Sequence, residues 1–306
     1  MTLLILDRGQ DRLPPYLEWL DEPDDAVLFT GRSPGEIEGS QVRGYAEVRC
    51  FPRYASSGQV ELAAVCLARD TTIRAIVAVA PEDAIRAGGL RDHLGLDGQR
   101  RQEAIAQQDL VALRARLHEA GIPAVRCGAV QRVCDLYWYG HHWGYPLRVR
   151  HRRRLGWPAA ARLDSDADVA AFTRGGLTGR LETVPSLLIE PASDSRERIT
   201  LSYRAAGPSP MPSACPAAAR SLGGAALARF TRPGDGAWRV QLARRGTGHD
   251  WRVDALGRAP GDEAALARAQ AGLGRREREP GAWAVTAATP ARRSTGAPWQ
   301  DKEEDR

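Results

Sequence analysis

Short apolar runs and helical stretches follow one another through the first hundred residues. Four runs are apolar enough to predict strands: residues 3–6, 26–29, 46–51 and 76–80. Residues 59–69 and 84–94 instead space their apolar positions at intervals typical of a helix. Apolar strands that alternate with helices predict a parallel sheet covered on both faces.

The fourth run is followed by the turn Pro81, Glu82 and Asp83. Loops at the carboxyl ends of parallel strands are the usual place for a binding site, so the turn is a candidate. Proline also suits the start of a helix, and acidic residues favour its positive end. We prefer this capping interpretation.

A second region begins near residue 100 with a long helical pattern at 102–120, which Gly121 and Pro123 end. Its further predicted elements are a strand at 124–130, an aromatic helix at 133–143 and a strand at 145–150.

A third region begins near residue 183. Residues 186–190 and 198–204 are expected to form paired strands, before a Pro/Ala/Ser-rich connection at 207–219. Further strands at 237–242 and 250–256 and a helix at 264–273 follow. The polar stretch 275–306 predicts a disordered tail.

The composition is that of a soluble globular protein, with a net charge of +5. Of the 43 basic residues only Lys302 is a lysine, and such an arginine bias arises from a GC-rich coding sequence, so basicity alone does not favour a nucleic-acid partner. The five cysteines form no C-x-x-C pair, which predicts reduced thiols. With no long apolar segment and no signal-peptide pattern at the N-terminus, we expect a cytoplasmic protein without a membrane partner.

Several motifs occur in the order typical of one enzyme superfamily. The stretch VAPEDAIRAGGLRDHLGLDGQ at 79–99 is followed by Asp109, Leu113-Arg114 and Gly-Ile-Pro at 121–123. Farther on come GYPLRVRH at 144–151, LLIE at 187–190 and WRVDALGRAPGD at 251–262. From about residue 60 to residue 275 the chain resembles the ATP-grasp superfamily of carboxylate-amine ligases.

The resemblance implies a fold of α/β and α+β class. A small N-terminal parallel-sheet domain, residues 1–100, would be followed by two α+β subdomains that enclose a cleft. These subdomains are expected at 101–182 and, in shortened form, at 183–274, with the disordered tail at 275–306.

The resemblance also implies a reaction. Such ligases use ATP and Mg²⁺ to convert a carboxylate to an acyl phosphate, which an amine then displaces; cations hold the phosphates during the transfer. By their places in the motifs, Arg150 is expected to bind phosphate and Glu190 to lie at the adenine hinge. Asp254 is expected to bind Mg²⁺, and Arg258 to contact the acyl phosphate or substrate carboxylate.

The chain departs from the family pattern at three places. Leu110 replaces the first lysine, and Gln241 stands where the second metal-binding acid is expected. The arginines at 152–154 replace a small-residue loop, and they are either a phosphate clamp or a solvated basic turn. Asp254 is either a metal ligand or an acid paired with Arg252 or Arg258.

Two functions are compatible with the sequence. The first is a ligase that joins a small carboxylic acid to an amine or amino acid. The second is a lapsed member of the fold that acts as a partner or regulator of another enzyme, or whose cleft serves ATP-independent chemistry. Self-association into a homo-oligomer is compatible with either.

Overall fold

A computed structural model describes most of the chain. The described residues are 1–9, 13–20, 23, 25–37, 43–152, 161–174, 187–192, 197–205, 216–230, 238–244, 250–258, 263–272 and 283–290. They divide between two compact units. The first unit comprises Met1–Gln108, Leu201–Val240 and Leu256–Ala288, and the second comprises Asp109–Thr200, Gln241–Ala255 and Thr289–Arg306. The domain boundaries expected from the sequence stay a prediction.

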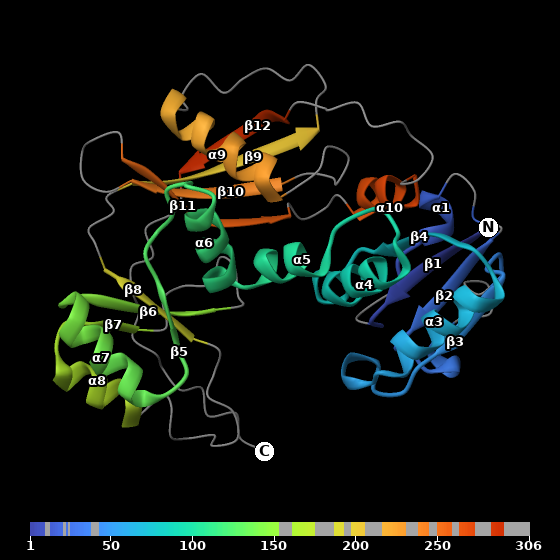
Figure 1. Cartoon of the computed structure of the whole chain (residues 1–306), viewed down its shortest axis with the longest axis horizontal. Coiled ribbons are helices and arrows are strands. Elements are labelled where there is room, and N and C mark those ends of the chain that lie inside the picture. Colours follow the sequence, from blue (N-terminus) through green and yellow to red (C-terminus); the bar gives the residue numbers. More distant parts are fainter. Residues whose placement is uncertain are drawn as a thin grey trace. The chain divides into compact units, whose positions relative to one another are not determined.

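The N-terminal part forms the predicted parallel sheet (Figure 1). Its strands are β1 (Thr2–Asp7), β2 (Ala26–Thr30), β3 (Glu47–Cys50) and β4 (Ile73–Ala78), in the order β3-β2-β1-β4. Every residue of β1 is buried, because alternate side chains enter two separate cores. Leu3 and Ile5 belong to one core, and Leu4 and Leu6 to the other.

Helices cover both faces of this sheet. They include α1 (Tyr16–Trp19), α3 (Gln59–Asp70), α4 (Pro81–Leu94) and, from far along the chain, α10 (Glu263–Ala271). As expected of a helix start, Pro81 begins α4 and Glu82 and Asp83 lie in its first turn, without a side-chain cap hydrogen bond. No helix in the described residues is long and apolar enough to cross a membrane.

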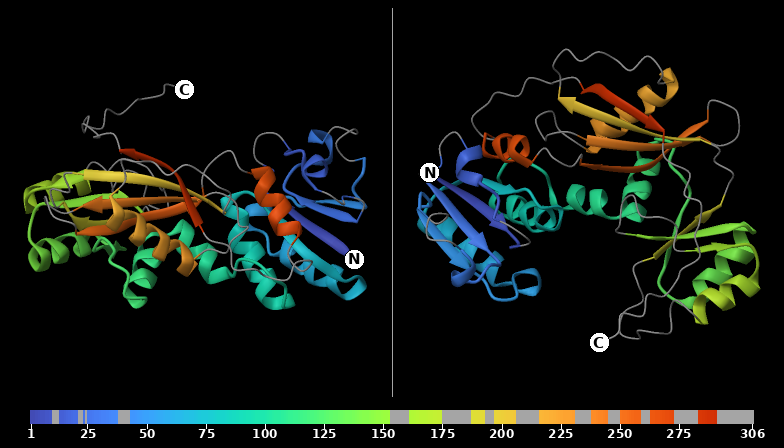
Figure 2. Two further views of the ribbon diagram at one scale, coloured as in Figure 1. Left: turned by 90° about the horizontal axis from the view of Figure 1, so that it is seen from above. Right: turned by 180° about the vertical axis from the view of Figure 1, so that it is seen from behind.

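Helix α10 returns to the N-terminal sheet, as both views in Figure 2 show. Leu266 and Ala267 enter the core shared with Leu3 and Ile5. The buried amide of Gln270 meets the end of β4: its Oε1 accepts from the backbone N–H of Ala78 at 2.8 Å. Its Nε2 donates to the Ala78 carbonyl at 3.3 Å.

Replacing Gln270 with leucine should therefore lower the free energy of unfolding by about 1–3 kcal/mol, because two buried backbone groups lose their partner. Urea unfolding measures the change. Exposed Gln102, replaced with leucine, is the control and should change stability by less than about 0.5 kcal/mol. Equal effects of the two substitutions would contradict a bridging role for Gln270.

The long helix predicted at 102–120 is wrong, because the structure has two helices. One residue lies between the end of helix α5 (Arg101–Gln108) and the start of α6 (Leu110–Glu119). Asp109 separates them with extended backbone, and its side chain accepts from the N–H groups of Val111 and Ala112. An acid that caps a new helix stops the preceding one.

An antiparallel sheet forms the centre of the second unit (Figure 1). Its strands are β5 (Gly128–Val130), β8 (Leu187–Pro191), β6 (Leu147–His151) and β7 (Ala161–Leu163), in that order across the sheet. Helices α7 (Val133–Trp143) and α8 (Asp166–Phe172) pack against it through a shared apolar core.

A further sheet has the order β11-β10-β9-β12. It comprises β9 (Glu197–Ala205), β10 (Trp238–Arg244), β11 (Trp251–Arg258) and β12 (Trp283–Pro290). The predicted pairing of 186–190 with 198–204 is wrong, since β8 and β9 belong to different sheets.

Two elements in this region did not follow from the sequence. Helix α9 (Ala217–Phe230) begins within the connection expected at 207–219 and packs Gly223 against the Tyr203 hydroxyl of β9. The expected disorder of 275–306 does not hold for β12, and the rest of that tail lies outside the described residues.

Candidate functional site

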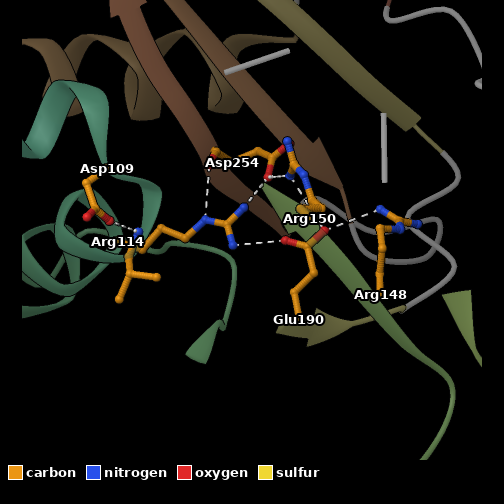
Figure 3. Close-up of polar contacts among 7 residues, drawn as sticks. Asp109, Arg114, Arg148, Arg150, Glu190 and Asp254 are labelled. Carbon is orange, nitrogen blue, oxygen red and sulfur yellow. Dashed lines mark hydrogen bonds and ion pairs between the residues drawn. The ribbon is translucent and has the colours of Figure 1, made fainter. Parts of the chain in front are cut away.

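Charged side chains from four elements meet inside the second unit (Figure 3). Arg114 comes from α6, Arg148 and Arg150 from β6, Glu190 from β8 and Asp254 from β11. Three of the four residues to which the sequence assigns roles, Arg150, Glu190 and Asp254, are therefore neighbours. Arg114 belongs to a family-like motif, but no role was assigned to it from the sequence.

Arg114 connects the two acids of this cluster. Its Nη1 donates to Glu190 Oε2 at 2.9 Å, and its Nη2 donates to Asp254 Oδ1 at 2.5 Å. Its Nε donates to the backbone carbonyl of Asp254 at 3.1 Å. The guanidinium thus holds α6 to both β8 and β11.

The two arginines of β6 approach the same acids. Arg150 Nη1 donates to Asp254 Oδ1 at 3.0 Å and lies 3.5 Å from Glu190 Oε1. Arg148 Nη1 donates to Glu190 Oε1 at 3.4 Å. Each carboxylate is consequently shared by two or more guanidinium groups, and Asp254 Oδ1 accepts from two of them.

Strand register explains why these side chains converge. Arg148 lies directly opposite Glu190 in the antiparallel pair of β6 and β8. Arg150, two residues along β6, projects from the same face of the sheet. The segment after α6 runs beside β11, where Val125 N–H donates to the Val253 carbonyl at 3.0 Å and Val253 N–H donates to Pro123. This pairing brings Asp254 next to α6.

The cluster is closed to water, and its four buried members carry two charges of each sign. Arg114, Arg150, Glu190 and Asp254 are each at most 4% exposed. Two positive charges therefore face two negative ones, with Arg148 reaching in from a partly exposed position. Burial alone would lower the pKa of Arg114, but the carboxylates of Asp254 and Glu190 raise it above its usual value.

A second ion pair lies beside the cluster. Arg152 Nε donates to Asp109 Oδ1 at 2.7 Å, the oxygen that also caps α6. The neighbouring Leu110 is completely buried, so the position of the expected lysine belongs to the core. Of the basic run at 152–154, Arg152 thus contacts a helix cap, and the other two arginines lie outside the described residues.

Arg258 is the fourth residue with an expected role. It ends β11, and its side chain is not among those the structure describes, so its contact with an acyl phosphate stays a prediction. Arg252, one of the two ion-pair partners considered for Asp254, contacts Asp250 at 3.2 Å. Asp254 does form ion pairs, with Arg114 and Arg150.

The arrangement does not fit a magnesium ion. Mg²⁺ requires oxygen ligands in near-octahedral geometry and is usually held by one or two carboxylates. Asp254 Oδ1 is already bound by two cations, and the position of the second acid is Gln241 on β10. In the described part of the chain, no group of three or more His, Cys, Asp or Glu side chains is placed to hold a metal.

No protein-family model matches the sequence, and no curated protein matches it. Several solved structures are similar to this chain. N5-carboxyaminoimidazole synthetase from Staphylococcus aureus, complexed with ADP, has a TM-score of 0.60 at 13% identity, covering 94% of this chain and 80% of the synthetase. L-amino acid ligase from Bacillus licheniformis has a TM-score of 0.56 at 11% identity, covering 87% of this chain and 69% of the ligase.

The name of a third similar structure includes the name of its fold. The RimK domain protein ATP-grasp from Sphaerobacter thermophilus has a TM-score of 0.51 at 17% identity, covering 88% of this chain and 98% of that protein. The chain therefore has the ATP-grasp fold, and the α/β and α+β class expected from the sequence is confirmed. Fold alone does not establish a reaction.

Proposed function

We propose that this chain is a lapsed ATP-grasp protein, which retains the ligase fold and acts as a partner or regulator of another enzyme. One observation carries the proposal. The arginine expected to hold phosphate and the aspartate expected to hold Mg²⁺ are bound to each other, with Arg150 Nη1 3.0 Å from Asp254 Oδ1. Both are buried, so each satisfies the charge of the other.

Binding a triphosphate at Arg150 would require opening this cluster. Among the described residues, Arg114 is then the buried cation that still contacts the carboxylates of Glu190 and Asp254. Removing one partner from a buried ion pair costs about 3–5 kcal/mol. Because each 1.4 kcal/mol is a factor of ten in affinity, that opening weakens nucleotide binding by about two to four orders of magnitude. The buried Leu110 offers no second cation to offset the loss.

A specific observation favours an active ligase as the second candidate. Arg150, Glu190 and Asp254 lie far apart in the sequence, yet they meet at one place. Two of the structural neighbours are named as a ligase and a synthetase. In this case ATP and Mg²⁺ would separate the ion pairs, and a small carboxylic acid would be joined to an amine or amino acid.

Stability in the presence of Mg-ATP separates the two candidates. A protein that binds ATP at one hundred times its dissociation constant gains about 2.7 kcal/mol of unfolding free energy. We expect millimolar ATP with Mg²⁺ to leave the urea-unfolding midpoint unchanged. MgCl₂ alone is the control for a salt effect.

An assay of ADP release across carboxylic acids paired with amino acids completes the test. ADP release that requires both substrates and disappears in Arg150→Ala would contradict the proposal and establish the ligase. Stabilisation by ATP without ADP release would show that nucleotide binding persists while the reaction has lapsed.

A further inference from the structure

A groove of about 520 Å³ follows helix α4 in the first unit, apart from the charged cluster of the second unit. Its walls come from α4, from α3 through Glu61 and Val65, and from Arg8 and Arg101. Helices α3 and α4 contact each other beside the parallel sheet (Figure 1).

The groove extends along the helix. Glu82, Arg86, Gly89 and His93 recur at spacings of three or four residues and so lie on one face of α4. At a rise of 1.5 Å per residue, the distance from Glu82 to His93 along the axis is about 16 Å. One end lies at the carboxyl ends of β1 and β4, where Arg8 and Asp83 follow the strands. Strand order reverses at β1, and such positions in open α/β sheets commonly bind ligands.

The two ends of the groove differ in charge. At the sheet end, the charged lining residues are two acids, Glu82 and Asp83, and one cation, Arg8. Asp83 is only 2% exposed, and its Oδ2 accepts from the backbone N–H of Arg8 at 2.9 Å. At the opposite end the lining residues are His93 and Arg101. The backbone N–H of Arg101 donates to Asp92 Oδ2 at 3.1 Å, and its guanidinium forms no ion pair with a described residue.

The middle of the groove is close to neutral and largely apolar. Arg86 Nε donates to Glu61 at 2.8 Å, and its guanidinium lies over the ring of Tyr54 at 4.6 Å. Because the charges of Arg86 and Glu61 are paired with each other, the centre of the groove carries little net charge. Ile85 and Leu90 add apolar surface there.

Gly89 keeps the centre open. A Cβ at this position would meet only the flexible Cδ of Arg101, at 3.5 Å, so packing does not require glycine. The adjacent Gly88 is different, because its Cβ would lie 2.7 Å from the backbone nitrogen of Arg101. Glycine inside a helix is destabilising relative to alanine. An open groove floor accounts for Gly89 where packing does not.

We propose that this groove binds an elongated zwitterion. An amine would lie at Glu82 and Asp83, a carboxylate at Arg101 and His93, and an apolar body over Gly89. An extended chain spans about 3.3–3.6 Å per residue, so a peptide of four or five residues with free termini has the matching length. The site goes beyond the proposed function and would give a regulator a small molecule to sense.

Oligoalanine peptides of three to six residues, with free termini, are suitable probes. Isothermal titration to the full chain should show the tightest binding at four or five residues. Acetylating the amine or amidating the carboxylate removes one terminal charge. Each modification should weaken binding about fivefold, the upper range for a solvent-exposed ion pair.

Variants locate the binding. Arg101→Gln and Glu82→Gln should each weaken binding about fivefold, and Arg69→Gln, an exposed α3 arginine outside the groove, should leave it unchanged. Gly89→Leu should abolish binding while circular dichroism and the Tm show a folded protein. Binding that is absent at millimolar peptide, that ignores peptide length or terminal charge, or that falls equally in Arg69→Gln would overturn the proposal.

Discussion

Replacing Arg114 with leucine should lower the free energy of unfolding by about 3–5 kcal/mol at neutral pH. Its side chain is 2% exposed and holds both Glu190 and Asp254 by charge-assisted hydrogen bonds. After the substitution, Arg150 is the buried cation among the described residues that still contacts the two carboxylates. Desolvated charge without a partner is among the few causes of so large a loss. Unfolding in urea measures this loss of stability, because urea is a denaturant that adds no salt.

Arg148 provides a matched control within the same cluster. It contacts Glu190 at 3.4 Å, but its side chain is 25% exposed. Water therefore screens the pair, and Arg148→Leu should cost no more than about 1 kcal/mol. Similar losses in Arg114→Leu and Arg148→Leu would show that the cluster is not closed to water.

A double substitution tests charge balance directly. Arg114→Leu with Asp254→Leu removes one charge of each sign and leaves Arg150 beside Glu190. The double variant should be more stable than Arg114→Leu alone, because apolar residues often replace a buried ion pair at little cost. If the stability losses of Arg114→Leu and Asp254→Leu simply add in the double variant, the two charges do not stabilise each other, which would contradict the proposed charge balance.

The parallel sheet could be predicted because its strands are short, apolar and buried on both faces. Residues 3–6 and 76–80 fall on or next to β1 and β4 for this reason. The break between α5 and α6 could not be predicted as readily, since apolar spacing continues through Asp109. The partner Arg152 lies 43 residues away, so the local pattern contains no sign of it.

Strand pairing was harder to predict for a similar reason. Consecutive strands in a sequence usually pair or neighbour one another, which favoured pairing of β8 with β9. The actual partners of β8 are β5 and β6, with Arg148 opposite Glu190. Such long-range complementarity becomes visible only when the register is known.

Arg114 illustrates what the sequence could have shown about the site. It lies on the buried stripe of α6 with Leu110, Leu113 and Leu117. A charged residue within an apolar stripe must find buried partners, so its position alone predicts an internal ion pair. The identity of the partners, on β8 and β11, requires the tertiary structure.

The free energy of unfolding should fall by about 3 kcal/mol as pH rises from about 3 to 7, through the titration of Asp83 alone. Burial raises the pKa of this carboxyl from 3.8 to about 6, although the Arg8 N–H opposes the shift. The native state therefore holds the proton at pH values where the unfolded chain has released it. Stability from this group is present at low pH and is lost as pH rises through the folded pKa.

Comparison with Asp83→Asn isolates this effect from other carboxyls. The nearby Asp7 also has a pKa raised by burial, so the wild-type pH profile contains both groups. Asparagine keeps an oxygen for the Arg8 N–H but carries no charge, so the variant should exceed the wild type by about 3 kcal/mol at pH 7 and match it near pH 3. Urea unfolding at several pH values measures the difference. A difference independent of pH would contradict the burial of an ionisable Asp83, whereas the expected profile would show that this buried acid lowers stability at neutral pH.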